Sequence, residues 1–145
     1  IFSFFGDLFL LFNWGFIPGL GSFLLAHIFY ILGLNKFKKN SATVFLPLIL
    51  VYLFGLIYFL YPHLGDMLIP VIFYGITIST MFYFSVKTGS KLLVFGALLF
   101  VISDSILAYN LFVNSNVSLN VLVMITYVFA QIMLVKGFIK ESSEL

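Results

Sequence analysis

Three ionisable side chains lie inside long apolar runs of this sequence: Asp7, His27 and Asp104. An ionisable group within a membrane-spanning segment costs a few kcal/mol, so such groups usually face the interior of a helix bundle and mark a functional site. Two carboxyl groups in different environments can act as a proton donor and as a negative charge that stabilises a cation. A histidine can donate or accept a proton near neutral pH. These residue types therefore indicate proton-transfer chemistry in an apolar environment.

Other polar side chains recur at helical spacing in the same apolar runs. Ser3 and Gly6 share a helical face with Asp7, and His27 shares one with Phe23 and Tyr30. We expect these faces to enclose a common polar cavity. Five further polar residues are predicted to contact either the catalytic side chains or a hydroxyl of the substrate, and we call these second contacts: Ser103, Tyr74, Tyr127, Gln131 and Asn110.

A structural role is the alternative for these second contacts. Taken singly, Tyr127, Gln131 and Asn110 fit hydrogen bonds between helices, which are worth about 1 kcal/mol or less in a membrane. Gly96 and Ala97 are predicted to be positions where two helices pack closely. A buried carboxylate without a paired cation is rare as a purely structural feature. A functional role is therefore favoured over a structural one for Asp7 and Asp104, and less strongly for His27.

The composition excludes a soluble domain. The 145 residues are 63% hydrophobic and only 8% charged, with a mean hydropathy of +1.21, whereas soluble domains carry roughly 25% charged residues. The absence of cysteine excludes a disulfide framework and a thiolate metal site. With one buried histidine and no H-E-x-x-H spacing we expect no metal and no cofactor. There is no basic pattern typical of nucleic-acid binding.

The apolar runs have the length of membrane helices. A helix that crosses the hydrocarbon core needs about 20 mostly apolar residues, and the runs lack the period-two alternation of barrel strands. We predict an all-α, polytopic transmembrane bundle of about six spanning helices with short antiparallel connections. It forms a single domain over 1–145, with a cytoplasmic tail over 137–145. The predicted helices cover about 1–14, 17–34, 43–60, 67–86, 91–113 and 117–136.

The positive charges predict the orientation in the membrane. Given six spans, every lysine falls on one side: Lys36, Lys38, Lys39, Lys87, Lys91, Lys136 and Lys140. Cytoplasmic loops carry the excess of lysine and arginine. We therefore predict a multi-pass integral membrane protein whose lysine-rich loops and C-terminus are cytoplasmic.

The polar residues also sit in recognisable strings. "FFGDLFLLF" holds Asp7, "FIPGLGSFLLAHIFYI" holds His27, and "IPVIFYGITISTM" holds Tyr74. "FGALLFVISDSILAYNLF" holds Asp104, and "ITYVFAQIMLVKGF" holds Gln131. In this order and spacing the strings resemble the YhhN family, which includes the lysoplasmalogenases of animal membranes. That family has further spans before its Gly-Asp motif, which agrees with our expectation that the chain, beginning at Ile1 inside an apolar run, has lost upstream sequence.

The resemblance implies a hydrolase that cleaves the vinyl ether bond of lysoplasmalogens, giving a fatty aldehyde and a glycerophospho head group. The expected partners are a lysophospholipid substrate and membrane lipid. Vinyl ether hydrolysis needs a proton donor, a negative charge beside the oxocarbenium ion and a base for water. We hypothesise that Asp7 and Asp104 fill the first two roles in either order. His27 is then an acid, a base or a hydrogen-bond partner of a carboxylate.

Two other functions remain open at this stage. An ion- or proton-coupled carrier would use the same buried aspartates and histidine as a relay, and helices broken in mid-span would favour it. A non-catalytic lipid-binding subunit would keep its function with both aspartates neutralised.

Overall fold

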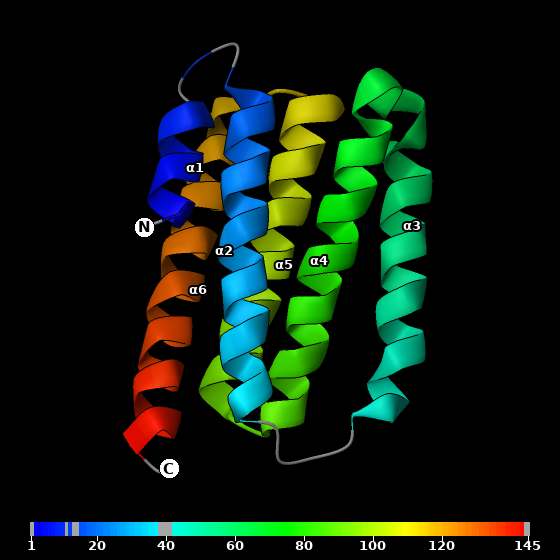
Figure 1. The fold of residues 1–145 in the computed structure, drawn as a ribbon. Coiled ribbons are helices and arrows are strands. Elements are labelled where there is room, and N and C mark those ends of the chain that lie inside the picture. The colour runs from blue at the N-terminus through cyan, green and yellow to red at the C-terminus, as the bar shows by residue number, and fades with distance from the viewer. Residues whose placement is uncertain (1, 11, 13–14, 38–41, 144–145) are drawn as a thin grey trace.

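The computed structural model describes residues 2–10, 12, 15–37 and 42–143, without the side chains of Phe2, Phe4, Asp7 and Leu10. All regular structure in this part of the chain is helical, which confirms the predicted fold class. The elements form a bundle of antiparallel neighbours (Figure 1). They are α1 (Phe2–Leu10), α2 (Phe16–Lys36), α3 (Leu46–Leu64), α4 (Leu68–Thr88), α5 (Lys91–Phe112) and α6 (Val117–Ser143), with short 3₁₀ turns at Thr43–Phe45 and Gly65–Met67.

The core of the bundle lies where α2, α4, α5 and α6 meet. Helix α5 packs most extensively on α6, α2 packs on α1 and α4, and α3 lies at the outer edge against α4 and α5. Because α3 has neighbours on one side only, most of its apolar side chains remain exposed. The buried core residues are Leu34, Ile78, Met81, Leu93, Ala97, Phe100, Val101, Ala130 and Leu134.

Four helical stretches among the described residues are long and apolar enough to cross a membrane. The predicted count of six spanning helices is therefore not supported. Helix α1 has 9 residues, fewer than the about 20 that a crossing needs. One stretch of 46 residues contains both α3 and α4, which lie side by side in Figure 1. The stretches are Phe16–Lys36, Thr43–Thr88, Lys91–Phe112 and Val117–Ser143.

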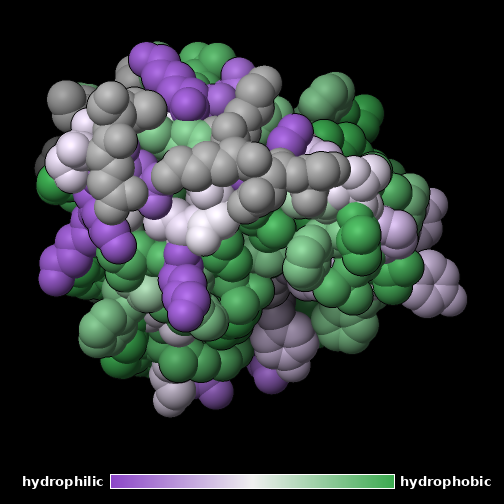
Figure 2. Space-filling model, turned by 90° about the horizontal axis from the view of Figure 1, so that it is seen from below, coloured by the Kyte–Doolittle hydropathy of each residue, from purple (hydrophilic) through white to green (hydrophobic). Residues whose placement is uncertain are grey.

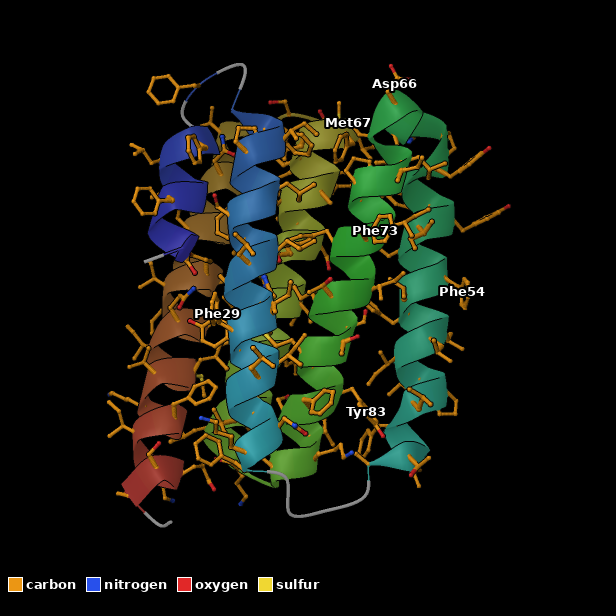
Figure 3. The ribbon with its side chains drawn as sticks, in the orientation of Figure 1. Phe29, Phe54, Asp66, Met67, Phe73 and Tyr83 are labelled. Carbon is orange, nitrogen blue, oxygen red and sulfur yellow. The ribbon has the colours of Figure 1, made fainter. Side chains whose placement is uncertain are left out.

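The outer surface of these helices is hydrocarbon-like. Phe54 points away from the bundle at the outer edge of α3 in Figure 3. Phe29, Phe54 and Phe73 are 56%, 68% and 63% exposed. A large, continuous apolar surface is unstable in water but stable in a bilayer. The chain is therefore an integral membrane protein.

Two helices continue four or more residues past their predicted ends. Helix α3 runs through Pro62 to Leu64 instead of ending at Leu60, because proline near a helix end removes only one hydrogen bond. The helix ends at Gly65, whose φ of 48° is readily adopted only by glycine. Helix α6 runs to Ser143 instead of Lys136. The first seven residues of the predicted tail are thus helical, since the Phe138 ring stacks on Tyr30 with centroids 5.8 Å apart and keeps this segment on the bundle.

The described lysines gather at one end of the bundle. Lys36 ends α2, Lys87 lies in the last turn of α4 and Lys91 begins α5, while Lys136 and Lys140 lie toward the end of α6. Those helix ends are the lower ones in Figure 1, and Asp66 lies at the opposite end in Figure 3. Figure 2 looks onto the lysine end and shows hydrophilic residues over part of it, with hydrophobic residues around them. Lys38 and Lys39 lie outside the described residues.

Small residues allow α5 and α6 to approach closely. A Cβ atom added at Gly96 would lie 3.0 Å from the backbone nitrogen of Leu134, and one at Gly137 would lie 2.7 Å from Leu93 Cδ2. Small residues at such positions let membrane helices gain packing contacts that a larger side chain would prevent. The predicted close-packing role of Gly96 is confirmed.

Gly96→Val is therefore expected to lower the free energy of unfolding by about 1–3 kcal/mol, because the added methyl groups push α5 away from the backbone of α6. Thermal unfolding of the purified protein in detergent measures the change. Gly55→Val is the matched control, since a Cβ at Gly55 meets nothing within 4 Å. Equal effects of the two substitutions would contradict the close-packing role.

Candidate functional site

Asp104 and Tyr74 form the centre of the candidate site. The Tyr74 hydroxyl, on α4, donates a hydrogen bond to Asp104 Oδ2 on α5. Both residues lie in helices that are apolar enough to span a membrane. A carboxylate at this depth is stable only when the protein supplies the hydrogen bonds that water would otherwise provide. The structure thus places one predicted catalytic residue in direct contact with one predicted second-contact residue.

His27 lies against the same tyrosine. Its ring is fully buried and packs edge-to-face on Tyr74, with ring centroids 5.4 Å apart, and on Phe100, at 4.7 Å. Nδ1 is 2.7 Å from the carbonyl oxygen of Phe23. Since a carbonyl only accepts, Nδ1 carries the hydrogen and Nε2 is the ring nitrogen with a free lone pair. Nε2 is buried and has no hydrogen-bond partner in the described part of the chain.

Phe100 joins this group to Tyr127. The Tyr127 ring on α6 lies edge-to-face on Phe100 at 5.4 Å and on Phe23 at 6.0 Å. Edge-to-face pairs hold rings in a fixed relative orientation. Four helices therefore contribute rings to one cluster beside Asp104, and Tyr127 belongs to it.

A second polar network ties α1, α2 and α6 together. Tyr30 donates to Gln131 Oε1 at 2.5 Å, and Gln131 Nε2 donates to Ser3 Oγ at 3.2 Å. Tyr30 also stands 6.5 Å from Phe100, centroid to centroid, so the network adjoins the aromatic cluster. Gln131 therefore lies next to the site while forming hydrogen bonds between helices.

Ser103 and Asn110 make contacts that connect α5 to α6. Ser103 Oγ donates to the carbonyl of Val123 at 3.1 Å. Asn110 Nδ2 donates to Asn120 Oδ1 at 2.5 Å, and its Oδ1 accepts from the backbone nitrogen of Asn116 at 2.7 Å. These bonds fix the turn between the two helices. The structure does not bring Asn110 to the Asp104–Tyr74 pair.

Asp7 lies in α1, and its side chain is outside the described part of the structure. Its described neighbours nevertheless locate the helix. Ser3 is bonded to Gln131, and a Cβ at Gly6 would lie 2.7 Å from the ring of Phe23. The face of α1 that holds Ser3 and Gly6 is therefore packed against α2 and α6.

Two small pockets share the Asp104–Tyr74 pair as a common wall. The α2-side pocket, about 50 Å³, lies between α2, α4 and α5 and is lined by Phe16, Phe23 and Leu107 among others. The α3-side pocket, about 40 Å³, lies between α3, α4 and α5 and includes Tyr52 and Ser105. Each is large enough for a few water-sized groups. The carboxyl group is thus reachable from two sides.

Tyr52 and Ser105 were not predicted as site residues. The Tyr52 hydroxyl is hydrogen-bonded to Ser105 Oγ, directly beside Asp104 in sequence. The apolar run that holds Tyr52 contains no charged residue or histidine and has no polar face. Its sequence therefore did not indicate a site residue. Ser105 could have been found from its position next to Asp104. Phe100 was likewise not predicted as a site residue.

The donor set of the described residues does not resemble a metal centre. No group of three or more His, Cys, Asp or Glu side chains comes together in the described ranges. Tyrosine, carboxylate and a single imidazole with a free nitrogen are instead groups that exchange protons. The arrangement is suited to acid–base chemistry within the membrane.

Comparison with known proteins identifies the family. A model of the YhhN family matches residues 1–138. The chain belongs to the YhhN family. The match includes every helix that lines the two pockets, and it confirms the resemblance carried by the strings around Asp7, His27, Tyr74, Asp104 and Gln131.

The relatives of this YhhN-family chain include proteins named lysoplasmalogenase. That of Mycobacterium tuberculosis (strain CDC 1551 / Oshkosh) is 30% identical over 135 residues, covering 87% of this chain and 52% of the relative. Lysoplasmalogenase TMEM86B of Homo sapiens is 31% identical over 132 residues, covering 89% of this chain and 56% of the relative. Lysoplasmalogenase TMEM86B of Mus musculus is 33% identical over 141 residues, covering 94% of this chain and 59% of the relative. The chain thus spans about half the length of the curated relatives it matches. No solved structure matches it significantly.

The Gln131 network gives a test of how the site is held. Gln131→Leu removes two hydrogen bonds between helices and leaves the Tyr30 hydroxyl without its acceptor, so we expect the free energy of unfolding to fall by about 1–2 kcal/mol. Thermal unfolding in detergent measures this. Thr126→Val is the control, because the Thr126 hydroxyl bonds only to carbonyls of its own helix. Unchanged stability of Gln131→Leu would show that the network does not hold the helices together.

Proposed function

We propose that this chain forms the catalytic part of a membrane hydrolase that cleaves the vinyl ether bond of lysoplasmalogen-type lipids. The observation that carries the proposal is the Asp104–Tyr74 pair, a hydrogen-bonded carboxyl group held between membrane-spanning helices at the meeting point of two pockets. Membership of a family whose relatives are named lysoplasmalogenase supports the choice of substrate.

The reaction makes three demands on the protein. A proton must reach the β-carbon of the vinyl ether, which leaves an oxocarbenium ion at the α-carbon. Water then adds to that carbon and loses a proton, and the resulting hemiacetal collapses to an aldehyde and the free glycerol hydroxyl. One water is consumed and the proton is returned. The costly species is the cation, so a nearby negative charge in a low-dielectric site is the largest contribution that the protein can make.

Asp104 suits the role of that negative charge. Its Oδ2 accepts a hydrogen bond from the Tyr74 hydroxyl, as an ionised carboxylate oxygen does. A carboxylate fixed by a hydrogen bond needs little reorganisation when positive charge develops beside it. Tyr74, in turn, is oriented by its contact with the His27 ring. In this scheme Asp104 stabilises the oxocarbenium ion, and Tyr74 holds the Asp104 carboxylate in place.

Asp7 and His27 supply the proton transfers in the same scheme. Asp7 lies one residue after Gly6, on a helix packed against α2 and α6, and is assigned as the proton donor. His27 Nε2 has a free lone pair within a buried ring, which is what a base for the attacking water requires. Tyr127, Gln131, Ser103 and Asn110 then act as supporting residues that orient the helices and rings around the reacting groups.

The carrier hypothesis receives no support from the helix geometry. Prolines lie in the first turns of α2, α3 and α4, and the remaining one, Pro62, lies near the end of α3. Many transporters bind their substrates and ions at helices that are unwound in mid-membrane. The described helices run continuously past Asp104 and His27.

We further propose that α3 and α4 each cross the membrane and that the lysine end faces the cytoplasm. Helix α3 has 19 residues and α4 has 21, close to the about 20 that a crossing needs. Lysine is enriched on the cytoplasmic side of membrane proteins, and all five described lysines lie at one end of the bundle.

Neutralising either aspartate tests the hydrolase. Asp104→Asn and Asp7→Asn in the intact protein should each lower the rate of aldehyde release from a lysoplasmalogen by about 100-fold or more, because each removes a charge or a proton donor. Asp66→Asn, in the exposed turn Gly65–Met67, is the control and should keep the native rate. Native turnover in both aspartate variants, with thermal unfolding unchanged, would rule out this mechanism.

Single cysteines test the orientation. The chain has no cysteine of its own, so Lys140→Cys and Asp66→Cys give isolated probes at opposite ends of the bundle. A membrane-impermeant maleimide added to intact cells should label the Asp66→Cys protein, and should label Lys140→Cys only after the cells are opened. Labelling of both from outside, or the reverse pattern, would contradict the orientation.

A further inference from the structure

The two pockets that meet at Asp104 differ in chemistry. Apart from Asp104 and Tyr74, every side chain that lines the α2-side pocket is hydrocarbon, from Phe16 at the start of α2 to Phe112 at the end of α5. The α3-side pocket adds two hydroxyl groups, those of Tyr52 and Ser105. A ligand that spans both pockets past the carboxyl group therefore needs an apolar part on one side and a hydroxyl-bearing part on the other.

The donor of the hydrogen bond between Tyr52 and Ser105 can be identified. Ser105 Oγ donates to the carbonyl oxygen of Val101 at 2.6 Å, so its single hydrogen is in use. The hydrogen between Tyr52 and Ser105 is therefore the phenolic one, and Tyr52 donates to Ser105. This leaves the Tyr52 oxygen with free lone pairs, on a side chain that is 37% exposed. It is an acceptor set to receive a hydrogen bond from a ligand.

The bond that is cleaved fixes how a lipid must lie. In a vinyl ether lipid the reacting carbons join the alkenyl chain to the glycerol oxygen, so a carboxyl group beside them has the chain on one side and the glycerol on the other. Neither pocket, at about 50 and about 40 Å³, can enclose a whole lipid chain. The α2-side pocket takes the carbons next to the reacting bond, and Leu111 on its lining is 48% exposed, so the rest of the chain continues into the bilayer.

We propose that Tyr52 and Ser105 form a subsite for the free hydroxyl of the glycerol, with Tyr52 accepting the hydrogen of that hydroxyl while Ser105 holds the phenol in position. The subsite rests on the proposed function and deepens it, because it makes Tyr52 a specificity-determining residue. A lipid with an acyl or methyl group on that oxygen has no hydrogen to donate and leaves the Tyr52 lone pairs unpaired. Its bulk also has to fit against Leu53 and Leu56 of the same pocket.

A binding measurement with uncleavable lipids tests this inference. The probes are a saturated 1-alkyl-ether lysophosphocholine lipid and its 2-O-methyl counterpart, each titrated against the purified intact protein. The native protein should bind the free-hydroxyl lipid about tenfold more tightly, the difference that one good hydrogen bond makes. Tyr52→Phe should reduce this preference to about twofold or less. Ser105→Ala should also reduce it, because the phenol loses the acceptor that fixes its hydrogen.

Tyr58→Phe is the matched control on the same helix. The Tyr58 side chain is 84% exposed on the outer surface of α3 and should leave the preference unchanged. An undiminished preference in Tyr52→Phe, or equal loss in Tyr58→Phe, would overturn the subsite. With cleavable substrate, Tyr52→Phe should raise KM for the free-hydroxyl lipid while changing kcat little, whereas a fall in kcat alone would argue against a binding role.

The two proposals fail in different ways. Because saturated ethers are not hydrolysed, the binding preference is measured without turnover. A preference that depends on Tyr52 in a protein that releases no aldehyde would support the subsite and refute the hydrolase. Aldehyde release that depends on Asp104, with no preference between the two probes, would support the hydrolase and refute the subsite.

Discussion

A carboxyl group held among apolar helices is the constraint on which this structure depends. Within hydrocarbon no water compensates the charge, so the protein must supply the partners itself. Asp104 receives the Tyr74 hydroxyl across the α4–α5 contact, and Tyr74 is in turn set by the His27 ring from α2. The carboxyl environment therefore requires that three helices keep their mutual positions. The close α5–α6 packing and the Gln131 network hold α5 and α2 against their common neighbour α6.

The sequence predicted those features that depend on local composition. Helix type and approximate bounds follow from the length of the apolar runs. The polar residues within those runs, among them Tyr74, His27 and Asp104, were predicted to lie around a common cavity. The structure shows the contacts that join these three residues. The ends of α3 and α6 were predicted too early, because Pro62 near a helix end costs little and because the attachment of Phe138 to Tyr30 is a tertiary contact. The predicted count of six spanning helices is not supported, since four stretches of the described residues are long and apolar enough to cross a membrane.

Other parts of the site depend on which helices become neighbours, which a single sequence does not reveal. Tyr52 is one tyrosine among several on an apolar helix, and its relation to Ser105 arises only because α3 packs against α5. Asn110 was predicted to contact the catalytic groups or the substrate, but its amide instead forms hydrogen bonds within the α5–α6 turn. A polar residue in a membrane helix can form hydrogen bonds within a turn or line a cavity, and both cases have the same sequence pattern.

Asp104 lies closer to one end of the bundle than to the other. It lies eight residues before the end of α5 at Phe112, or about 12 Å at 1.5 Å per residue, and the α2-side pocket reaches that same end through Phe16 and Phe112. The lysine end is farther away along the helix. The glycerol of a membrane lipid lies just beneath its head group, so a lipid from the leaflet at the Asp66 end has the shorter displacement to the carboxyl group. For the lipid substrate proposed above, the leaflet at the Asp66 end would therefore be the nearer source.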